Sequence, residues 1–301
     1  MMLHGILPVW KPTNCTSHDV VAIIRRLTRQ KKVGHTGTLD PAVTGVLPIC
    51  LGRATRIAEY LQEQPKSYEG TFTLGIATDT QDQDGTVIAR TEGVRISAPE
   101  LEKVFRQFTG RIAQTPPMFS AVKVKGQRLY ELARQGKSIE RKARYIHIYS
   151  LELLRIHEGK HPQIDFRVVC SKGTYVRTLC VDIGRALGIP AHLSHLVRTK
   201  SGPFTKQHCV PLSELEHTPP VEWPRRWLLP LEAGLTEFPM FTVSGRVGRK
   251  VRNGQPIDVS DESFSANTLL RVFVEKEFTA LYKVDANSQW ARPVKVFAEN
   301  R

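Results

Sequence analysis

The sequence predicts a mixed α/β fold of the α+β class, followed by a small β-rich module. Up to about residue 232, segments with the apolar spacing of helices alternate with short runs typical of strands. From about residue 238 the chain changes to short alternating apolar runs broken by Gly, Asn and Asp, such as 268–274. At 301 residues the chain is long enough for about two domains. We therefore expect one domain over residues 1–232 and a second over 238–301.

Four segments have the residue patterns of helices. Ser17 is a candidate N-cap for the first, in which Val20 and Ile24 share one face. Ser97 and Glu100 form a capping box at the start of the third. The expected helices are 17–30, 53–63, 97–108 and 174–187.

Five runs with the pattern of strands alternate with these helices. In the second run Tyr68, Phe72 and Leu74 share one face. The expected strands are 5–9, 68–74, 145–156, 163–171 and 192–200, of which the third and fourth are expected to pair. Between the last strand and the β-rich module, the prolines of 216–224 indicate a linker.

The charge of the chain is strongly positive. Forty-three Lys and Arg residues against twenty-nine Asp and Glu residues give a net charge of +14, which favours a polyanionic partner such as nucleic acid. The most cationic stretch lies in a segment at about 114–145, where aromatic residues are interleaved with basic ones. Basic groups bind phosphates and aromatic faces stack on bases, so this segment suits looped or single-stranded RNA, and the alternative is a solvated basic hairpin. Its eight basic residues are Lys123, Lys125, Arg128, Arg134, Lys137, Arg141, Lys142 and Arg144.

Several other classes of protein are not favoured. No apolar run approaches the roughly 20 residues needed to cross a bilayer, and the N-terminus lacks the pattern of a signal peptide. We therefore expect a cytoplasmic protein without membrane contact. The five cysteines are scattered, which predicts reduced, mostly buried thiols and neither disulfides nor a metal site. The acidic run 79–85 is a poor calcium loop, because Thr80 and Thr91 stand where such a loop requires Asp and Glu.

The stretch most suggestive of a function is 34–48, which holds one carboxylate, Asp40, among three glycines and two prolines. Glycine allows positive φ and proline fixes φ, so the loop follows a stiff, irregular path. Pro41 also pushes Asp40 towards extended geometry. The pattern indicates either a functional acid or an ordinary Asp-Pro turn, and the loop by itself is compatible with both.

Five motifs occur along the first 200 residues: Gly5 to Pro12 with its Lys-Pro, Gly34 to Pro41 continued by Leu51 to Thr55, Lys66-Ser67-Tyr68, Pro116 to Lys123, and Ser171 to Arg177. In this order they resemble the TruB family of tRNA pseudouridine synthases, which convert a uridine in the T arm of tRNA to pseudouridine. One small departure is Trp10, where many relatives have a polar residue.

The resemblance implies a pseudouridine synthase fold with a largely antiparallel central sheet flanked by helices, and a PUA-like RNA-binding domain over 238–301. It implies that Asp40 is the nucleophile and that Arg177 pairs with its carboxylate. Tyr68 would stack on the flipped uracil, and Tyr175 would handle protons beside that base. Without the family, Tyr68 could equally be a core tyrosine, and Arg177 a surface residue at a helix start.

The remaining candidate residues are expected to bind the substrate. The resemblance places His35 against the RNA bases near the target and makes Leu196 part of the pocket wall. The full set of expected substrate-binding residues is His35, Tyr68, Leu196, Lys11, Lys123, Arg128 and Arg141.

The chemistry explains why these residue types are needed. The reaction breaks the bond from C1′ to N1, rotates the base and rejoins it through C5, so we expect neither a cofactor nor a metal. A carboxylate could attack C1′, add to C6 or deprotonate the sugar, and all three routes stay open. Extruding the base costs roughly a few kcal/mol, which stacking on Tyr68 partly recovers. Arg177 would favour the anionic form of Asp40, which apolar walls disfavour.

The sequence therefore predicts a monomeric, cofactor-independent enzyme that acts on the T arm of tRNA without a protein partner. One alternative is an RNA-binding or RNA-folding protein whose catalysis has lapsed, against which the intact set of Asp40, Tyr68, Tyr175 and Arg177 argues. Another alternative keeps the chemistry but directs it at a different RNA.

Overall fold

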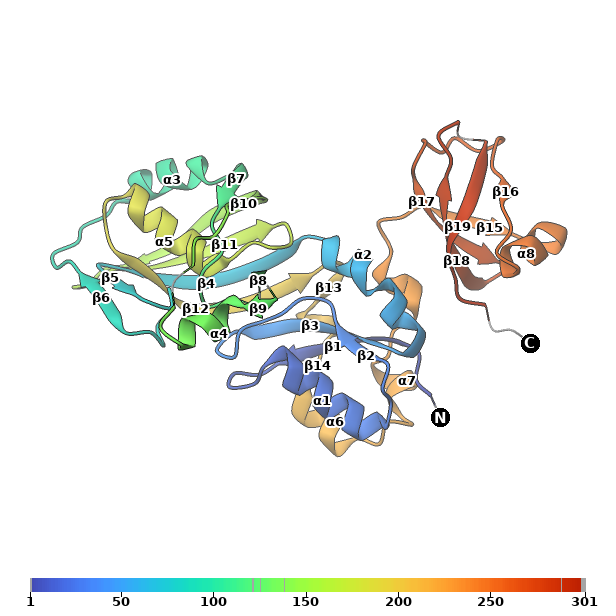
Figure 1. Ribbon diagram of the computed structural model, residues 1–301, viewed down its shortest axis with the longest axis horizontal. Coiled ribbons are helices and arrows are strands. Elements are labelled where there is room, and N and C mark those ends of the chain that lie inside the picture. Colours follow the sequence, from blue (N-terminus) through green and yellow to red (C-terminus); the bar gives the residue numbers. More distant parts are fainter. Residues whose placement is uncertain (1, 121, 125, 138, 288, 299–301) are drawn as a thin grey trace.

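A ten-stranded sheet organises the larger part of the molecule (Figure 1). The computed structural model describes residues 2–120, 122–124, 126–137, 139–287 and 289–298. Along the sheet the strands follow the order β14, β1, β3, β12, β4, β11, β10 and β7, with β13 paired to β12 and β2 paired to β3. The strands are β1 (Gly5–Lys11), β2 (Val33–His35), β3 (Thr44–Leu51), β4 (Lys66–Leu74), β7 (Gly110–Gln114), β10 (Arg144–His157), β11 (Gln163–Cys170), β12 (Ala191–Ser201), β13 (Phe204–Thr205) and β14 (Val210–Pro211).

Most neighbouring strands of this sheet run in opposite directions. Among the described strands of this sheet, only β1 with β14 and β3 with β12 pair in parallel. Strands β10 and β11 form the expected antiparallel pair, and β11 continues antiparallel onto β4. The expected mixed fold with a largely antiparallel central sheet is therefore confirmed.

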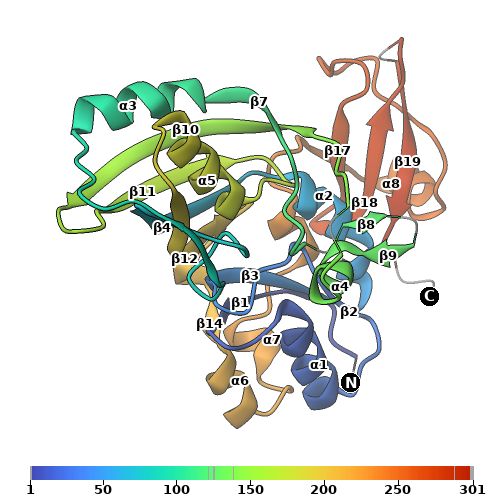
Figure 2. The same ribbon diagram turned by 60° about the vertical axis from the view of Figure 1, so that its left-hand side comes forward.

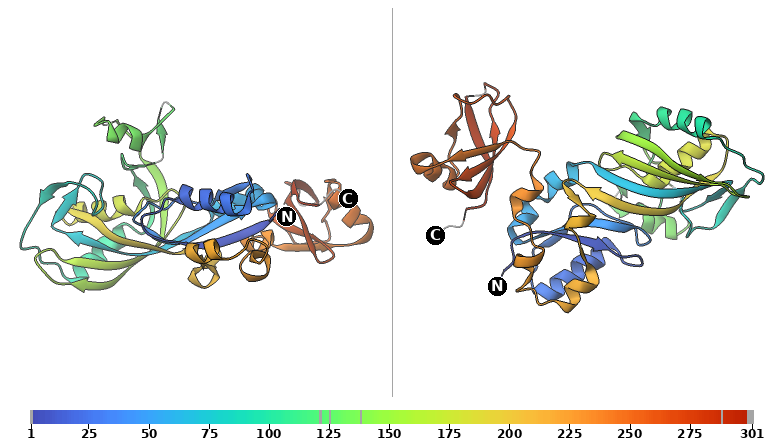
Figure 3. Two further views of the ribbon diagram at one scale, coloured as in Figure 1. Left: turned by 90° about the horizontal axis from the view of Figure 1, so that it is seen from below. Right: turned by 180° about the vertical axis from the view of Figure 1, so that it is seen from behind.

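Helices cover both faces of the sheet. Helix α5 packs on β12 and α3 packs on β10, at the end of the sheet away from the C-terminal module (Figure 1). A small hairpin with α4 projects from the side that carries α1, whereas α6 and α7 lie on the opposite side (Figures 2 and 3). These elements are α1 (Ser17–Thr28), α2 (Ala58–Glu63), α3 (Ala98–Gln107), α4 (Leu129–Arg134), α5 (Val176–Ala186), α6 (Leu212–His217) and α7 (Trp223–Arg226), with the hairpins β5 (Ile76–Thr78)–β6 (Val87–Arg90) and β8 (Lys123–Val124)–β9 (Gln127–Arg128).

The N-cap of α1 lies one residue earlier than the sequence predicts. Thr16, not Ser17, is the N-cap, and it forms a capping box with Asp19. An N-cap needs a side-chain oxygen that reaches the third helical residue, and Thr16 meets this condition. Ser17 is therefore the first helical residue, and its hydroxyl is available to the loop beside it.

Two further helical segments differ from the prediction. The single helix expected at 53–63 is a 3₁₀ helix, η1 (Gly52–Ile57), followed by α2. The expected linker at 216–224 instead joins α6 to α7 within the fold, and Trp223 is fully buried in the main hydrophobic cluster. Prolines indicate turns but do not show whether the segment is buried. Replacing a buried tryptophan by alanine costs about 3–5 kcal/mol of stability.

The C-terminal part forms a separate five-stranded sheet with its own hydrophobic cluster. The expected β-rich module is therefore present. It contacts the larger part through Leu281 and Phe297, which share a cluster with Ile6. Its elements are β15 (Met240–Val243), α8 (Gly245–Arg252), β16 (Ile257–Asp258), β17 (Leu269–Val274), β18 (Glu277–Val284) and β19 (Trp290–Val296). The short helices η2 (Lys206–His208) and η3 (Leu231–Gly234) belong to the larger part.

Candidate active site

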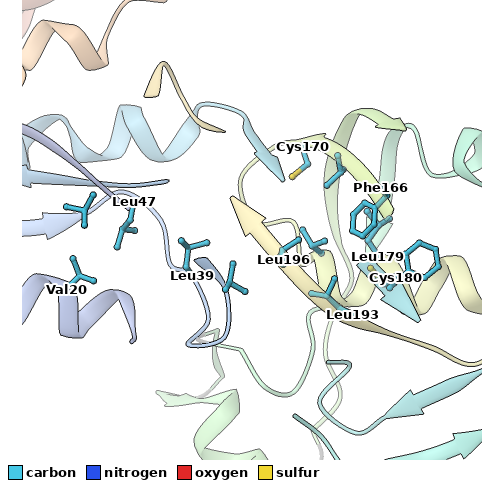
Figure 4. Packing of buried hydrophobic residues seen from close by; sticks show 14 of the residues in the cluster. Val20, Leu39, Leu47, Phe166, Cys170, Leu179, Cys180, Leu193 and Leu196 are labelled. Carbon is cyan, nitrogen blue, oxygen red and sulfur yellow. The ribbon is translucent and has the colours of Figure 1, made fainter. Parts of the chain in front are cut away.

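Asp40 lies in the loop of residues 36–43 that joins β2 to β3, and the backbone of this loop is held from two neighbouring elements. From α1, Ser17 Oγ accepts a hydrogen bond from Leu39 N at 2.8 Å and donates one to Leu39 O at 3.3 Å. From β1, Lys11 Nζ donates to Pro41 O at 3.3 Å. Leu39 also points into the main hydrophobic cluster (Figure 4). The residues on both sides of Asp40 are thus fixed.

Lys11, which the sequence predicts to bind substrate, is bound to carbonyl groups of its own chain in the structure. Its side chain is fully buried, and Nζ donates to the carbonyl oxygens of Pro12, Cys15 and Pro41. Burial lowers the pKa of the Lys11 ammonium. These carbonyl groups satisfy the buried ammonium, because an unpaired buried charge would be costly, and the bond to Pro41 O holds the loop.

Arg177 forms an ion pair with the Asp40 carboxylate, with 2.8 Å between Nη2 and Oδ2. It comes from the first turn of α5, where the helical spacing predicts it. The two side chains differ in exposure, since Arg177 is 9% exposed and Asp40 is 46% exposed. The guanidinium is therefore a fixed part of the wall, while the carboxylate faces an accessible space.

The arginine has three further partners that hold its plane. Nη1 lies 3.4 Å from Asp82 Oδ2 and donates to Thr80 O at 3.0 Å, and Nη2 donates to Phe119 O at 2.9 Å. Asp82 was not among the residues predicted for the site. Asp82 belongs to the acidic run 79–85, which the sequence analysis considers only as a calcium loop. Nothing in that run indicates that it faces Arg177.

Tyr68 and Leu196 lie on the paired strands β4 and β12. Tyr68 is half-buried at the border of the main hydrophobic cluster, and burial raises the pKa of its hydroxyl. Leu196 is buried and pairs with Gly70, where a Cβ atom would lie 2.9 Å from the leucine side chain. The glycine thus leaves the room that Leu196 occupies beside the site.

Tyr175 is the N-cap residue of α5, so it stands two residues before Arg177. Gln114 at the end of β7 holds its backbone, accepting from Tyr175 N at 2.8 Å and donating to Tyr175 O at 3.1 Å. Burial raises the pKa of the Tyr175 hydroxyl, which the positive charges of Arg144 and Arg177 partly oppose. The tyrosine therefore keeps its proton at neutral pH.

His35 ends β2 and is partly buried next to the loop. Its Nδ1 accepts a hydrogen bond from Gly37 N at 3.3 Å, which requires an unprotonated nitrogen. Burial, helped by the charges of His18 and Arg198, lowers the pKa of His35 to about 4. The imidazole is therefore neutral at neutral pH, which is compatible with a role in positioning a base.

Arg198 on β12 was missed by the sequence analysis, although it is only 1% exposed. Nε donates to Val46 O at 2.7 Å, Nη2 to Gly37 O at 3.1 Å and Nη1 to Thr38 O at 3.5 Å. The available signal was the two-residue period of a strand, which places Arg198 on the same face as Leu196. An arginine in phase with a buried leucine needs hydrogen-bond acceptors inside the protein.

The basic segment near 114–145 forms the projecting part around β8, β9 and α4 (Figure 3). The side chains of Lys123 and Arg128 lie outside the described part of the structure. Arg141 Nη1 donates to Pro116 O at 3.1 Å. Arg141 also lines a cavity of about 600 Å³ together with Gln81 and Asp182. Arg177 Nη2 donates to Phe119 O of this segment, so the segment reaches the residues around Arg177.

The five cysteines are free, and Cys50, Cys170 and Cys180 are buried. Among the described residues, no group of three or more His, Cys, Asp or Glu side chains is placed to hold a metal ion. In the described part of the chain, no helix is long and apolar enough to span a membrane.

Solved structures share this fold over nearly the whole chain. The structure titled as a Cbf5-Nop10-Gar1 complex is similar with a TM-score of 0.74 and 28% identity, covering 98% of this chain and 84% of that one. A structure of an H/ACA RNP bound to a substrate RNA containing 2′-deoxyuridine has a TM-score of 0.75 and 26% identity, covering 98% and 86%.

Family models define the class of the protein as a pseudouridylate synthase. The N-terminal domain model of the TruB family pseudouridylate synthases matches residues 25–176, and the C-terminal domain model of tRNA pseudouridylate synthase B matches 177–236. The chain is 50% identical to tRNA pseudouridine synthase B of Geobacillus thermodenitrificans, over 98% of this chain and 100% of that one. It is 44% identical to that of Halalkalibacterium halodurans over the full length of both. The chain belongs to the TruB family.

Proposed function

We propose that this enzyme isomerises a uridine in the T arm of tRNA to pseudouridine, with Asp40 as the nucleophile on a flipped-out base. The observation that carries the proposal is the accessible Asp40 carboxylate held 2.8 Å from the buried guanidinium of Arg177. The guanidinium pairs with the carboxylate and holds it in one orientation. The relatives named tRNA pseudouridine synthase B support tRNA as the substrate.

The proposed sequence of events uses only groups of this chain and the RNA. The target base leaves the stack at a cost of roughly a few kcal/mol and lies against Tyr68. Asp40 reacts with the nucleotide, the bond between C1′ and N1 breaks, the base turns, and a new bond joins C1′ to C5. The hydrogen on C5 leaves as a proton and N1 gains a proton, so neither oxidant nor group donor is consumed. Tyr175, which keeps its proton beside the site, is the proposed proton-handling group.

The test follows the hydrogen that the reaction releases from C5. T-arm RNA carrying tritium at uridine C5 is incubated with the wild type and with Asp40→Asn, which has nearly the same shape but cannot act as a nucleophile. We expect tritium release from the wild type alone, with both proteins binding the RNA. Release from neither protein, with binding intact, would leave an RNA-binding protein whose catalysis has lapsed. Mapping pseudouridine in total RNA from a deletion strain tests the T arm as the target.

We also propose that the C-terminal module, 238–301, is a PUA-like RNA-binding domain separate from the catalytic domain 1–232. Its own hydrophobic cluster supports the division, because a domain needs its own core. Helix α8 supports RNA binding, since Arg246, Arg249 and Arg252 are exposed three residues apart along it. Removal of 238–301 should weaken binding of full-length tRNA more than binding of an isolated T arm.

We further propose that the enzyme acts as a monomer in the cytoplasm and needs no protein partner. The support is that one chain supplies Asp40, Arg177, Tyr68 and Tyr175 together. Light scattering on the purified protein, with the tritium assay run on the same sample, tests this proposal. An active monomer is the expected result, and activity confined to an oligomer or to a complex would refute it.

A further inference from the structure

We propose that Arg198 is a positioning residue that fixes the loop 36–43 and aligns Asp40 with Tyr68. This inference rests on the proposed role of Asp40 and adds the device that holds it in place. Arg198 lies on β12, outside the loop and outside the pair formed by Asp40 and Arg177. It is therefore a separate and independently testable part of the site.

The side chain of Arg198 holds the loop from both ends. Its three hydrogen bonds go to carbonyl oxygens of Gly37 and Thr38, which precede Asp40, and of Val46, which follows it. One rigid guanidinium plane thus fixes the spacing between the two ends of the loop. Ser17 and Lys11 each bind only one point between these ends. Arg198 therefore sets the position of the loop as a whole.

The backbone of Arg198 also presses against the loop exit. Gly45 pairs with Arg198 in the parallel contact of β3 with β12, and its φ is +119°. A Cβ atom at position 45 would lie 2.2 Å from Arg198 O and 2.7 Å from Arg198 N. Only glycine permits both the conformation and the approach. The contact places the exit of the loop directly on the strand that carries Arg198.

The same residue faces Tyr68 across the sheet. Arg198 and Tyr68 are opposite each other in the antiparallel pair of β12 and β4. Neighbouring side chains at such positions lie about 5 Å apart at Cβ. Arg198 consequently connects the loop that carries Asp40 to the strand that carries the proposed stacking tyrosine. A shift of Arg198 would change the relative position of these two groups.

Arg198 forms no salt bridge within the described residues, and its hydrogen bonds to carbonyl groups are what hold the loop. Lys66 offers a matched comparison. It is also buried and also binds carbonyl oxygens, but those belong to Leu61, Gln62 and Gln64 at the end of α2. Both sites carry a buried cation, and only one of them holds the loop of Asp40.

The experiment compares Arg198→Lys and Arg198→Met with the control Lys66→Met in the full-length protein. Three quantities are measured: the single-turnover rate of tritium release at saturating T-arm RNA, the affinity for that RNA, and hydrogen exchange of the peptide 34–47. We expect both Arg198 variants to lose about 100-fold in rate, because a displacement of about 1 Å has that effect. Affinity should stay within about threefold of the wild type, and exchange should rise in 34–47.

The control separates positioning from general stability. Lys66→Met should lower the melting temperature, while its rate and its exchange in 34–47 stay close to the wild type. An unchanged rate in Arg198→Lys and Arg198→Met would overturn the inference, and so would equal losses in Lys66→Met. Misfolding of both Arg198 variants would also overturn it, because Arg198 would then serve the fold as a whole. Failure of the proposed function is distinct, since the wild type itself would release no tritium.

Discussion

Cationic side chains around Asp40 are buried and bound, whereas those of α8 are exposed and unbound within the described part of the chain. Arg177 and Arg198 use their N–H groups to bind a carboxylate and carbonyl groups of the chain. The side chains of Arg246 and Arg249 on α8 have no hydrogen bond or ion pair to another described residue. The same residue type therefore has two different physical environments in one molecule.

The difference predicts two kinds of mutational effect. A buried, bound cation fixes geometry, so its removal should change the rate of the chemical step and leave affinity nearly unchanged. An exposed, unbound cation attracts phosphates from a distance, so its removal should change affinity in a salt-dependent way and leave the saturated rate unchanged. Substitutions of the buried cations and of the exposed cations should therefore have clearly different effects.

Arg177→Lys should have the largest effect on rate. Lysine keeps the positive charge but cannot hold Asp40, Asp82 and two carbonyl groups with one rigid plane. We expect the single-turnover rate to fall by about 10²–10³, the loss typical for a preorganised donor at a reacting group, with RNA affinity unchanged. Tritium release and filter binding on the same preparation measure both. A large loss of affinity would place Arg177 with the RNA-binding cations instead.

Asp82→Asn should have a smaller effect in the same direction. Asp82 Oδ2 lies 3.4 Å from Arg177 Nη1. Loss of this carboxylate loosens the guanidinium of Arg177 without removing it. We expect the rate to fall by about 10-fold, as for loss of one charge-assisted hydrogen bond of about 1.5 kcal/mol. Asp84→Asn, in the same acidic run, is the matched control. Equal effects of the two substitutions would show that only the charge of the run matters.

The architecture was largely predictable from the sequence, because it follows from local patterns. Strands β10 and β11 and helix α5 lie where their apolar spacing predicts them. The burial of Trp223 was not predictable from the same patterns, since the prolines around it report local conformation and burial depends on the distant sheet.

The site was predictable only in part, for the same physical reason. Arg177 could be placed beside Asp40 because the resemblance to a family supplied the pairing. Asp82 and Arg198 act through contacts between segments about 40 to 160 residues from the loop in sequence, and local spacing does not report such contacts. The sequence predicts that Lys11 binds substrate and does not show that its donors bind the chain itself. A buried cation and a phosphate-binding cation look alike in sequence.

Charge reversal in the basic segment should act on affinity. Lys137 and Lys142 are exposed on the projecting part of the molecule. Lys137→Glu with Lys142→Glu should weaken T-arm binding several-fold at low salt and reduce the dependence of affinity on salt by about two counterions. Lys103→Glu on α3 is the control for an exposed lysine outside this segment. Unchanged affinity in the double variant would show that this segment is not part of the RNA-binding surface.

Charge reversal on α8 should act on affinity for full-length tRNA in particular. Arg246→Glu with Arg249→Glu should weaken binding of tRNA by several-fold with a lower salt slope, and leave the isolated T arm unaffected. The saturated rate of tritium release should not change. Lys283→Glu on β18 is the control within the module. A lower rate at saturation would contradict the division between buried and exposed cations.

The smallest effect concerns His35, whose buried neutral ring makes the region around Asp40 sensitive to acid. The pKa of His35 is lowered from 6.5 to about 4 in the folded chain. Between these two pH values the unfolded chain binds a proton at His35, whereas the folded chain does not. Stability is therefore complete above about pH 6.5 and falls as the pH drops to about 4. His35→Asn should reduce this loss by about 1–2 kcal/mol, after allowance for partial exposure, in urea unfolding at pH 7 and 4.5. His195→Asn, at an exposed histidine of β12, should leave the loss unchanged. Identical acid losses in the wild type and His35→Asn would mean that His35 is hydrated in the folded state.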